Sequence, residues 1–188
     1  LVVRPELRTD PGIRPLLAAV AVVLAGYLAV ASARSAGVDR AARMTRRWGA
    51  VSGLAIAMSW CVFVVAWWDL HGLPLVIAAV LAVATGAVAA RSGRAVRVGA
   101  ASVTVAGLTA GLVVFILLML DTLATAGGHD GEAGRHGFHG GAVYWIGEGL
   151  ATSLALLVIV PVVTVMVGTL GAVAGAFGAR RQRLERLQ

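Results

Sequence analysis

The sequence predicts an all-α fold: a multi-pass transmembrane helical bundle of about five spans, with the N-terminus outside and the C-terminus cytoplasmic. Three observations predict it. Hydrophobic residues make up 59% of the 188 residues, more than the roughly half that is typical of soluble domains. Five nearly uncharged apolar runs are each long enough to cross a hydrocarbon core of about 30 Å. Arginines gather in alternate gaps between these runs.

The first predicted span covers residues 15–33. Its apolar core is longer than the roughly 7–15 residues of a signal-peptide core, so we expect it to be retained in the membrane, although Ala31, Ser32 and Ala33 resemble a cleavage site. We expect a helix here and in every later span, because backbone amides in lipid must find hydrogen-bond partners within their own segment.

The second and third predicted spans cover residues 49–68 and 72–90, and the gap between them contains no arginine. Trp48 precedes the second span, where tryptophan is typical of the membrane interface. Trp60 falls inside the span, so we expect it to pack against other helices.

The fourth and fifth predicted spans cover residues 99–120 and 150–178, and the fifth is longer than the roughly 20 residues that a crossing requires. Pro161 lies near the middle of the fifth span, where it removes a backbone donor and predicts a kink. The charged tail that follows predicts an i,i+4 ion pair between Arg181 and Glu185.

The arginines predict the orientation, because positive residues are enriched in cytoplasmic loops. They concentrate in the first gap, the third gap and the C-terminal tail: Arg34, Arg40, Arg43, Arg46, Arg47, Arg91, Arg94, Arg97, Arg180, Arg181, Arg183 and Arg186. The organisation that follows is a single integral membrane domain over 1–188, with an extracytoplasmic Gly/His-rich loop over 121–149 and a cytoplasmic basic tail over 179–188.

Small residues recur four apart within the predicted spans, a spacing that lets helix backbones approach closely. The pairs are Gly49 with Gly53, Gly107 with Gly111, Gly171 with Gly175, and Ala82 with Gly86. We expect these faces to pack within one chain, and dimerisation through one of them is the alternative.

Four residues of the predicted outer loop form a candidate metal site: His129, Asp130, His136 and His139. Imidazole and carboxylate together can bind a divalent transition metal, and a glycine-rich loop can wrap around an ion. Two other interpretations stay open: a solvated connector, or a pH sensor that responds through histidine protonation. No other cofactor is expected.

Several function classes are excluded or disfavoured. A sequence pI near 11.4 suggests a nucleic-acid partner, but the arginines flank apolar spans instead of covering a water-exposed face, so we expect membrane lipid as a partner and no nucleic acid. No Asp, Glu, His, Lys or Arg lies in the central turns of any span, which removes the residues of a midplane carrier site. No hydrolase, zincin or phosphate-loop motif is present, so we expect no enzyme.

The hypothesis that remains is a non-enzymatic accessory or structural component of a bacterial membrane assembly, in contact with a protein partner or a second copy through its small-residue faces. All sixteen basic residues are arginine, which is typical of a GC-rich bacterial genome. Together with the apolar spans, this predicts a location in a bacterial cytoplasmic membrane. The alternative is transition-metal transport or metal handling by the outer loop, and a weaker alternative is an outer-face pH or metal sensor.

Overall fold

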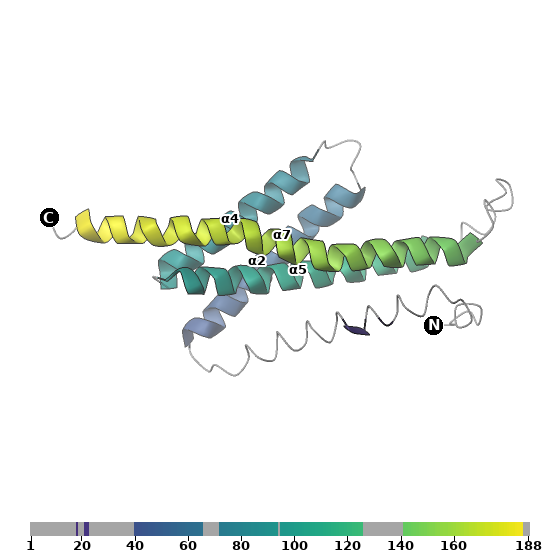
Figure 1. Cartoon of the computed structure of the whole chain (residues 1–188), viewed down its shortest axis with the longest axis horizontal. Coiled ribbons are helices and arrows are strands. Elements are labelled where there is room, and N and C mark those ends of the chain that lie inside the picture. Colours follow the sequence, from purple (N-terminus) through teal and green to yellow (C-terminus); the bar gives the residue numbers. More distant parts are fainter. Residues whose placement is uncertain are drawn as a thin grey trace. The chain divides into compact units, whose positions relative to one another are not determined.

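The computed structural model describes residues 40–65, 72–93, 95–125 and 141–185, together with residues 18, 21 and 22. The regular structure within these residues is entirely helical, as the sequence predicts (Figure 1). The four extended helices are α2 (Arg40–Val65), α4 (Leu73–Gly93), α5 (Val96–Thr125) and α7 (Gly141–Glu185).

Each of these four helices contains a stretch long and apolar enough to cross a membrane: Arg47–Val64, Leu73–Gly93, Val96–Ala124 and Ile146–Arg181. They correspond to the predicted spans 49–68, 72–90, 99–120 and 150–178. The first predicted span, 15–33, lies outside the described residues except for the three positions named above.

The helices extend beyond the predicted spans, and this narrows the predicted outer loop. α5 continues to Thr125 and α7 begins at Gly141, so both ends of the segment 121–149 are helical. Pro161 lies inside α7 without ending it, and the helix continues to Glu185 through the first part of the predicted tail. With 45 residues, α7 is about twice as long as one membrane crossing requires.

The start of α4 depends on a glycine. Gly72 has a φ of 81°, a backbone conformation that residues other than glycine rarely adopt. Its carbonyl oxygen accepts hydrogen bonds from the amides of Leu75 (3.0 Å) and Val76 (3.3 Å), which close the first turn. α4 ends at Gly93, and the amide of Ala95 donates to the carbonyl of Ala90 at 3.2 Å as the chain turns into α5.

The chain is divided into two compact units. One unit comprises 1–36 and 115–156, and the other comprises 37–114 and 157–188. The second unit therefore holds α2, α4, the first part of α5 and the second part of α7. The first unit holds the remainder of α5 and α7 among the described residues.

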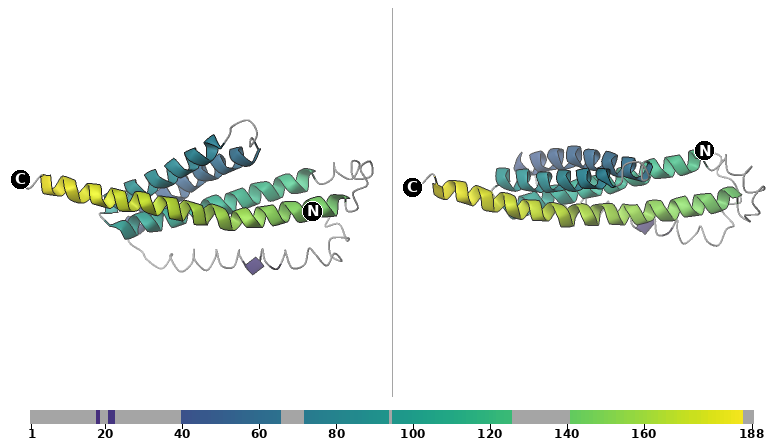
Figure 2. Two further views of the ribbon diagram at one scale, coloured as in Figure 1. Left: turned by 45° about the horizontal axis from the view of Figure 1, so that its top comes forward. Right: turned by 90° about the horizontal axis from the view of Figure 1, so that it is seen from above.

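α2 and α4 lie side by side in the second unit and run in opposite directions (Figure 2). The buried face of α4 is a stripe of small residues repeated every four positions, namely Pro74, Ala78, Ala82, Gly86 and Ala90. On α2, Trp60 is only 8% exposed and meets Phe63 edge to face, with ring centroids 5.9 Å apart. Trp60 is therefore buried, as expected of a packing residue, and its ring contact with Phe63 lies within α2.

Candidate functional site

The predicted metal site cannot be placed among the described helices. His129, Asp130, His136 and His139 all fall in 126–140, outside the described residues. Within the part of the chain that the structure describes, no group of three or more metal-binding side chains is present. The features with a defined geometry are the helix contacts of the second unit and the arginines at one of its ends.

The contact between α4 and α7, called here the α4–α7 seam, brings two helix backbones together at glycines. A methyl group added at Gly86 would overlap the carbonyl oxygen of Gly168 on α7. Methyl groups at Gly171 and Gly175 would overlap the carbonyl oxygens of Val83 and Ala87 on α4 in the same way. Only glycine permits this approach, which replaces side-chain contact with backbone contact along two turns.

α5 packs against this seam at its N-terminal end. An added Cβ at Gly99 would lie 2.5 Å from the Cβ of Ala172 on α7 and 2.6 Å from the carbonyl oxygen of Gly86 on α4, so three helices meet there. Further along α5, an added Cβ at Gly107 would lie 3.1 Å from the Cα of Pro161. Gly107 thus makes room for the proline of α7.

A second face of α5 packs against α2, forming the α2–α5 seam. An added Cβ at Gly49 would lie 2.8 Å from the carbonyl oxygen of Ser102, and one at Gly53 would lie 2.6 Å from that of Ala106. Ser102 is fully buried, and its hydroxyl has no hydrogen-bond partner among the described residues. This seam therefore leaves one buried polar atom unsatisfied, which costs about 1–3 kcal/mol.

The register of these contacts gives the helix directions within the second unit. Positions 49 and 53 on α2 meet 102 and 106 on α5 in ascending order, so these helices are parallel. Positions 83 and 87 on α4 meet 171 and 175 on α7 in ascending order, so they too are parallel. Because α4 runs opposite to α2, the starts of α2 and α5 and the ends of α4 and α7 share one end.

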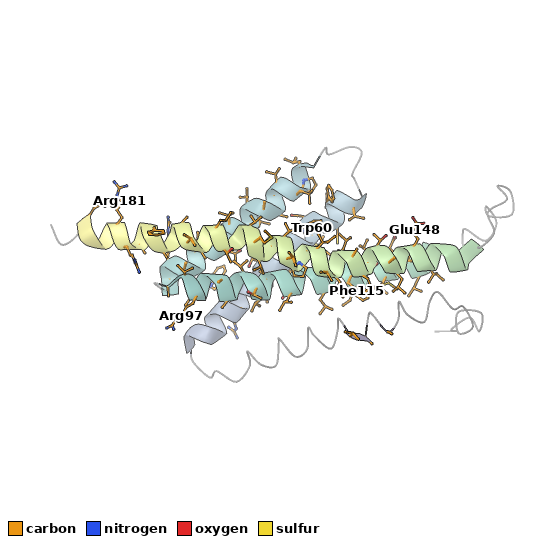
Figure 3. All side chains as sticks on the ribbon, viewed as in Figure 1. Trp60, Arg97, Phe115, Glu148 and Arg181 are labelled. Atoms are coloured by element: carbon orange, nitrogen blue, oxygen red, sulfur yellow. The ribbon has the colours of Figure 1, made fainter. Side chains whose placement is uncertain are left out.

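That end carries the arginines of the second unit whose side chains are described: Arg47, Arg91, Arg97, Arg180 and Arg181. We call it the arginine-rich end. Arg97 on α5 and Arg181 on α7 mark it in Figure 3. The predicted ion pair is confirmed, with Arg181 Nε 3.2 Å from Glu185 Oε1. Both side chains are exposed, so the pair contributes at most about 1 kcal/mol.

The arginines gather at one end of the unit, whether a helix begins or ends there, so the helix dipoles do not determine their positions. No described helix has an acidic residue in its first turn, and α5 opens with Arg97, where the helix dipole disfavours positive charge by about 0.3–1 kcal/mol. Placing an arginine in the middle of a span costs more, about 2.5–3.5 kcal/mol. The exclusion of charge from lipid is therefore the stronger of the two effects, and it explains the distribution.

The described interior contains little that could do chemistry. Its buried polar side chains are three hydroxyls, those of Ser102, Ser153 and Thr164, and no described ionisable side chain is buried. Most span hydroxyls bond a carbonyl one turn earlier on their own helix, as Thr85 does to Leu81 at 2.7 Å. The O–H donor of each of these hydroxyls is thus already engaged within its own helix.

The described part of the first unit holds two exposed acids, Asp121 on α5 and Glu148 on α7. Next to them, a methyl group at Gly149 would overlap the side chain of Thr122, so the two helices are again closely packed.

Trp48 in the second unit, 61% exposed beside Arg47, fits the predicted interfacial position.

All four predicted small-residue pairs are buried within one chain. The faces that they form are already occupied, so a partner would have to contact other surfaces. Gly99 and Gly168 carry closer contacts than some predicted pairs but are absent from the prediction. Gly168 with Ala172 and Ala95 with Gly99 have the small-residue spacing and could have been found, but this spacing does not mark Gly99 as a three-helix junction.

Comparison with protein-family models, with curated proteins and with solved structures gives no match. The class of protein therefore follows from the fold alone. Four apolar helices of spanning length, with mostly outward-facing apolar side chains, define a multi-pass helical membrane protein.

Proposed function

We propose that the protein is a non-enzymatic structural or accessory component of a bacterial membrane assembly. The observation that carries the proposal is the glycine-packed interior of the second unit. Helix backbones meet at Gly86, Gly99 and Gly171 without space for a methyl group, and no described charge is buried between them. Such an interior suits a rigid scaffold better than a path for a polar substrate.

One surface that is exposed for a partner is the outward face of α7. Large apolar side chains are exposed along it at alternating intervals of four and three residues: Ile159, Val163, Met166, Leu170, Val173 and Phe177. This spacing is typical of a helix seam that receives a second helix. In a protein without a partner, lipid would cover the same face, so the experiment must distinguish a protein neighbour from lipid.

Site-specific photo-crosslinking in intact cells tests the proposal. A benzophenone amino acid at Met166 (66% exposed) is expected to form a protein adduct of one defined mass. The matched control is the same amino acid at Val80 of α4, which is 60% exposed and faces outward. An adduct of twice the chain mass indicates a second copy of this chain. The absence of any protein adduct at Met166 and Leu170 would reject the proposal.

We propose further that the arginine-rich end faces the cytoplasm of the bacterial cell. The clustering of arginines from both helix starts and helix ends supports this orientation, because positive residues are retained on the cytoplasmic side. A reporter fused after Gln188 that is active only in the cytoplasm is expected to be active. Activity of a reporter that works only outside the membrane would reverse the orientation.

Metal handling by the predicted outer loop is a second candidate, supported by the three histidines and the aspartate within residues 129–139. Calorimetric titration of chelator-stripped protein with Zn²⁺, Ni²⁺ and Cu²⁺ tests it against a variant with His129, His136 and His139 replaced by alanine. Stoichiometric binding at micromolar affinity or better that is lost in the variant supports metal handling. Equal or absent binding in both proteins makes the loop a connector.

A further inference from the structure

We infer that the α4–α7 seam at the arginine-rich end binds the headgroup of an anionic phospholipid, with Arg91 as the phosphate-contacting residue. The inference goes beyond the proposed scaffold role and does not depend on it. It rests on where Arg91 lies, on the charge around it and on the apolar side chains next to it.

The side chain of Arg91 crosses from α4 onto α7 at a glycine. An added Cβ at Gly178 would lie 3.4 Å from Nη2, 3.7 Å from Nε and 3.9 Å from Cζ of Arg91. These are ordinary contact distances, so the guanidinium lies along the surface of α7 where that helix has no side chain. Arg91 is exposed, and its guanidinium lies at the seam beside α7.

The charge of this end is not neutralised within the described residues. Five arginines have described side chains there, and Glu185, which pairs with Arg181, is the one described carboxylate of the second unit. Arg91 has no carboxylate partner in the described part of the chain. A phosphodiester offers a guanidinium two acceptor oxygens in a matching geometry, and such charge-assisted pairs are stronger than neutral hydrogen bonds.

The apolar neighbours of Arg91 make lipid the appropriate source of that phosphate. Val88 lies three residues before Arg91 on α4, and Phe177 precedes Gly178 on α7, and both are more than half exposed. They belong to helices that are apolar enough to span a membrane. An acyl chain can lie along these side chains while the headgroup meets Arg91 at the membrane surface. Basic sites between helix ends are typical of anionic lipid recognition.

An anionic lipid is favoured over a zwitterionic one because the latter carries its own cation beside the phosphate. The arginines around the seam attract net negative charge, at about 1 kcal/mol for each arginine near the surface. The inferred site should therefore distinguish phosphatidylglycerol from phosphatidylcholine.

Native mass spectrometry of the full chain in detergent, titrated separately with phosphatidylglycerol and phosphatidylcholine, tests the inference. The wild-type protein is expected to bind phosphatidylglycerol more tightly. Arg91→Gln is expected to weaken the first phosphatidylglycerol site about five-fold, with phosphatidylcholine unchanged. The matched control is Arg181→Gln, which removes the same charge from the same end but from a residue already paired with Glu185. It is expected to change affinity less than two-fold.

A charge-preserving variant separates a defined binding site from general electrostatic attraction. In Gly178→Leu, the added side chain occupies the space where the Arg91 guanidinium lies, so phosphatidylglycerol affinity should fall while the net charge stays the same. Thermal unfolding shows whether each variant is folded. If Gly178→Leu is misfolded, the comparison of Arg91→Gln with Arg181→Gln tests the inference by itself. Equal affinity for both lipids, or equal losses in Arg91→Gln and Arg181→Gln, would overturn the inference.

Discussion

The α4–α7 seam and the α2–α5 seam join parallel helices in the same unit, but they achieve contact differently. In the α4–α7 seam, glycines on both helices bring backbone against backbone, and an added methyl group at Gly86 or Gly171 would overlap a carbonyl oxygen. In the α2–α5 seam, the glycines lie on α2, and an added Cβ at Gly49 would lie 2.8 Å from the carbonyl oxygen of Ser102 and 3.0 Å from the Cβ of Val105, so the backbone approach is less close.

The difference shows that a shared spacing of small residues does not imply equal tolerance of substitution. An added methyl group meets a backbone carbonyl oxygen in both seams, but the overlap is deeper in the α4–α7 seam, and the backbone of a packed helix cannot move without displacing the whole helix. The α2–α5 seam also buries the unsatisfied hydroxyl of Ser102. We therefore expect the α4–α7 seam to be the stronger and less tolerant of the two.

The largest expected effect is that of Gly171→Ala. The three atoms nearest to the added Cβ all belong to the backbone of Val83, so the helices must separate. We expect the free energy of unfolding to fall by about 3 kcal/mol, measured by denaturant unfolding in mixed micelles. Gly147→Ala is the matched control on the same helix, because an added Cβ there meets nothing within 4 Å. Equal stability of the two variants would contradict the description of the seam.

A smaller loss is expected for Gly49→Ala in the α2–α5 seam. The added Cβ would lie 2.8 Å from the carbonyl oxygen of Ser102 and 3.0 Å from the Cβ of Val105, a shallower overlap than the one at Gly171. We expect the same assay to give a loss of about 1 kcal/mol. A loss larger than that of Gly171→Ala would reverse the ranking of the seams.

Ser102→Ala is expected to act in the opposite direction and raise the free energy of unfolding by about 1 kcal/mol, because it removes a buried hydroxyl that has no partner. Ser153→Ala is the matched comparison, since the hydroxyl of Ser153 is also buried but donates to the carbonyl of Gly149 at 2.7 Å. Its removal should destabilise the protein. If Ser102→Ala proves destabilising too, the hydroxyl has a partner in the membrane.

The smallest effect is expected for Gly178→Ala at the end of the α4–α7 seam. An added Cβ at this position makes only ordinary contact with the Arg91 guanidinium, at 3.4 Å, so the helices need not move. We expect a change in the unfolding free energy below about 0.5 kcal/mol. A loss comparable to that of Gly171→Ala would show that the close backbone contact extends to the arginine-rich end.

Much of the fold could be predicted from sequence because the membrane imposes simple constraints. Long apolar runs give the four described spans, since only helices satisfy backbone amides in lipid. The pairing of Arg181 with Glu185 follows from i,i+4 spacing. The candidate metal site rests on His129, Asp130, His136 and His139, and it stays a prediction because these residues lie outside the described part of the chain.

Other features could not be predicted from a linear pattern. The ends of α5 and α7 extend into the segment expected to be a loop, because a glycine-containing stretch such as 141–149 can be helical when its helix packs against another. The contact of Gly99 with Gly86 and Ala172 joins the consecutive helices α4 and α5 to α7, which is distant in sequence. No local spacing encodes such a junction.

The sequence by itself determined that the chain is helical, that it crosses a membrane several times and that its arginines avoid the spans, because hydrophobicity and charge act on each segment independently of its neighbours. The tertiary structure alone decided which small-residue faces meet, that the predicted dimerisation faces are occupied within one chain, and that Arg91 lies on Gly178. These outcomes depend on the register and direction of paired helices, and register is set by close packing between segments and not by the composition of any one of them.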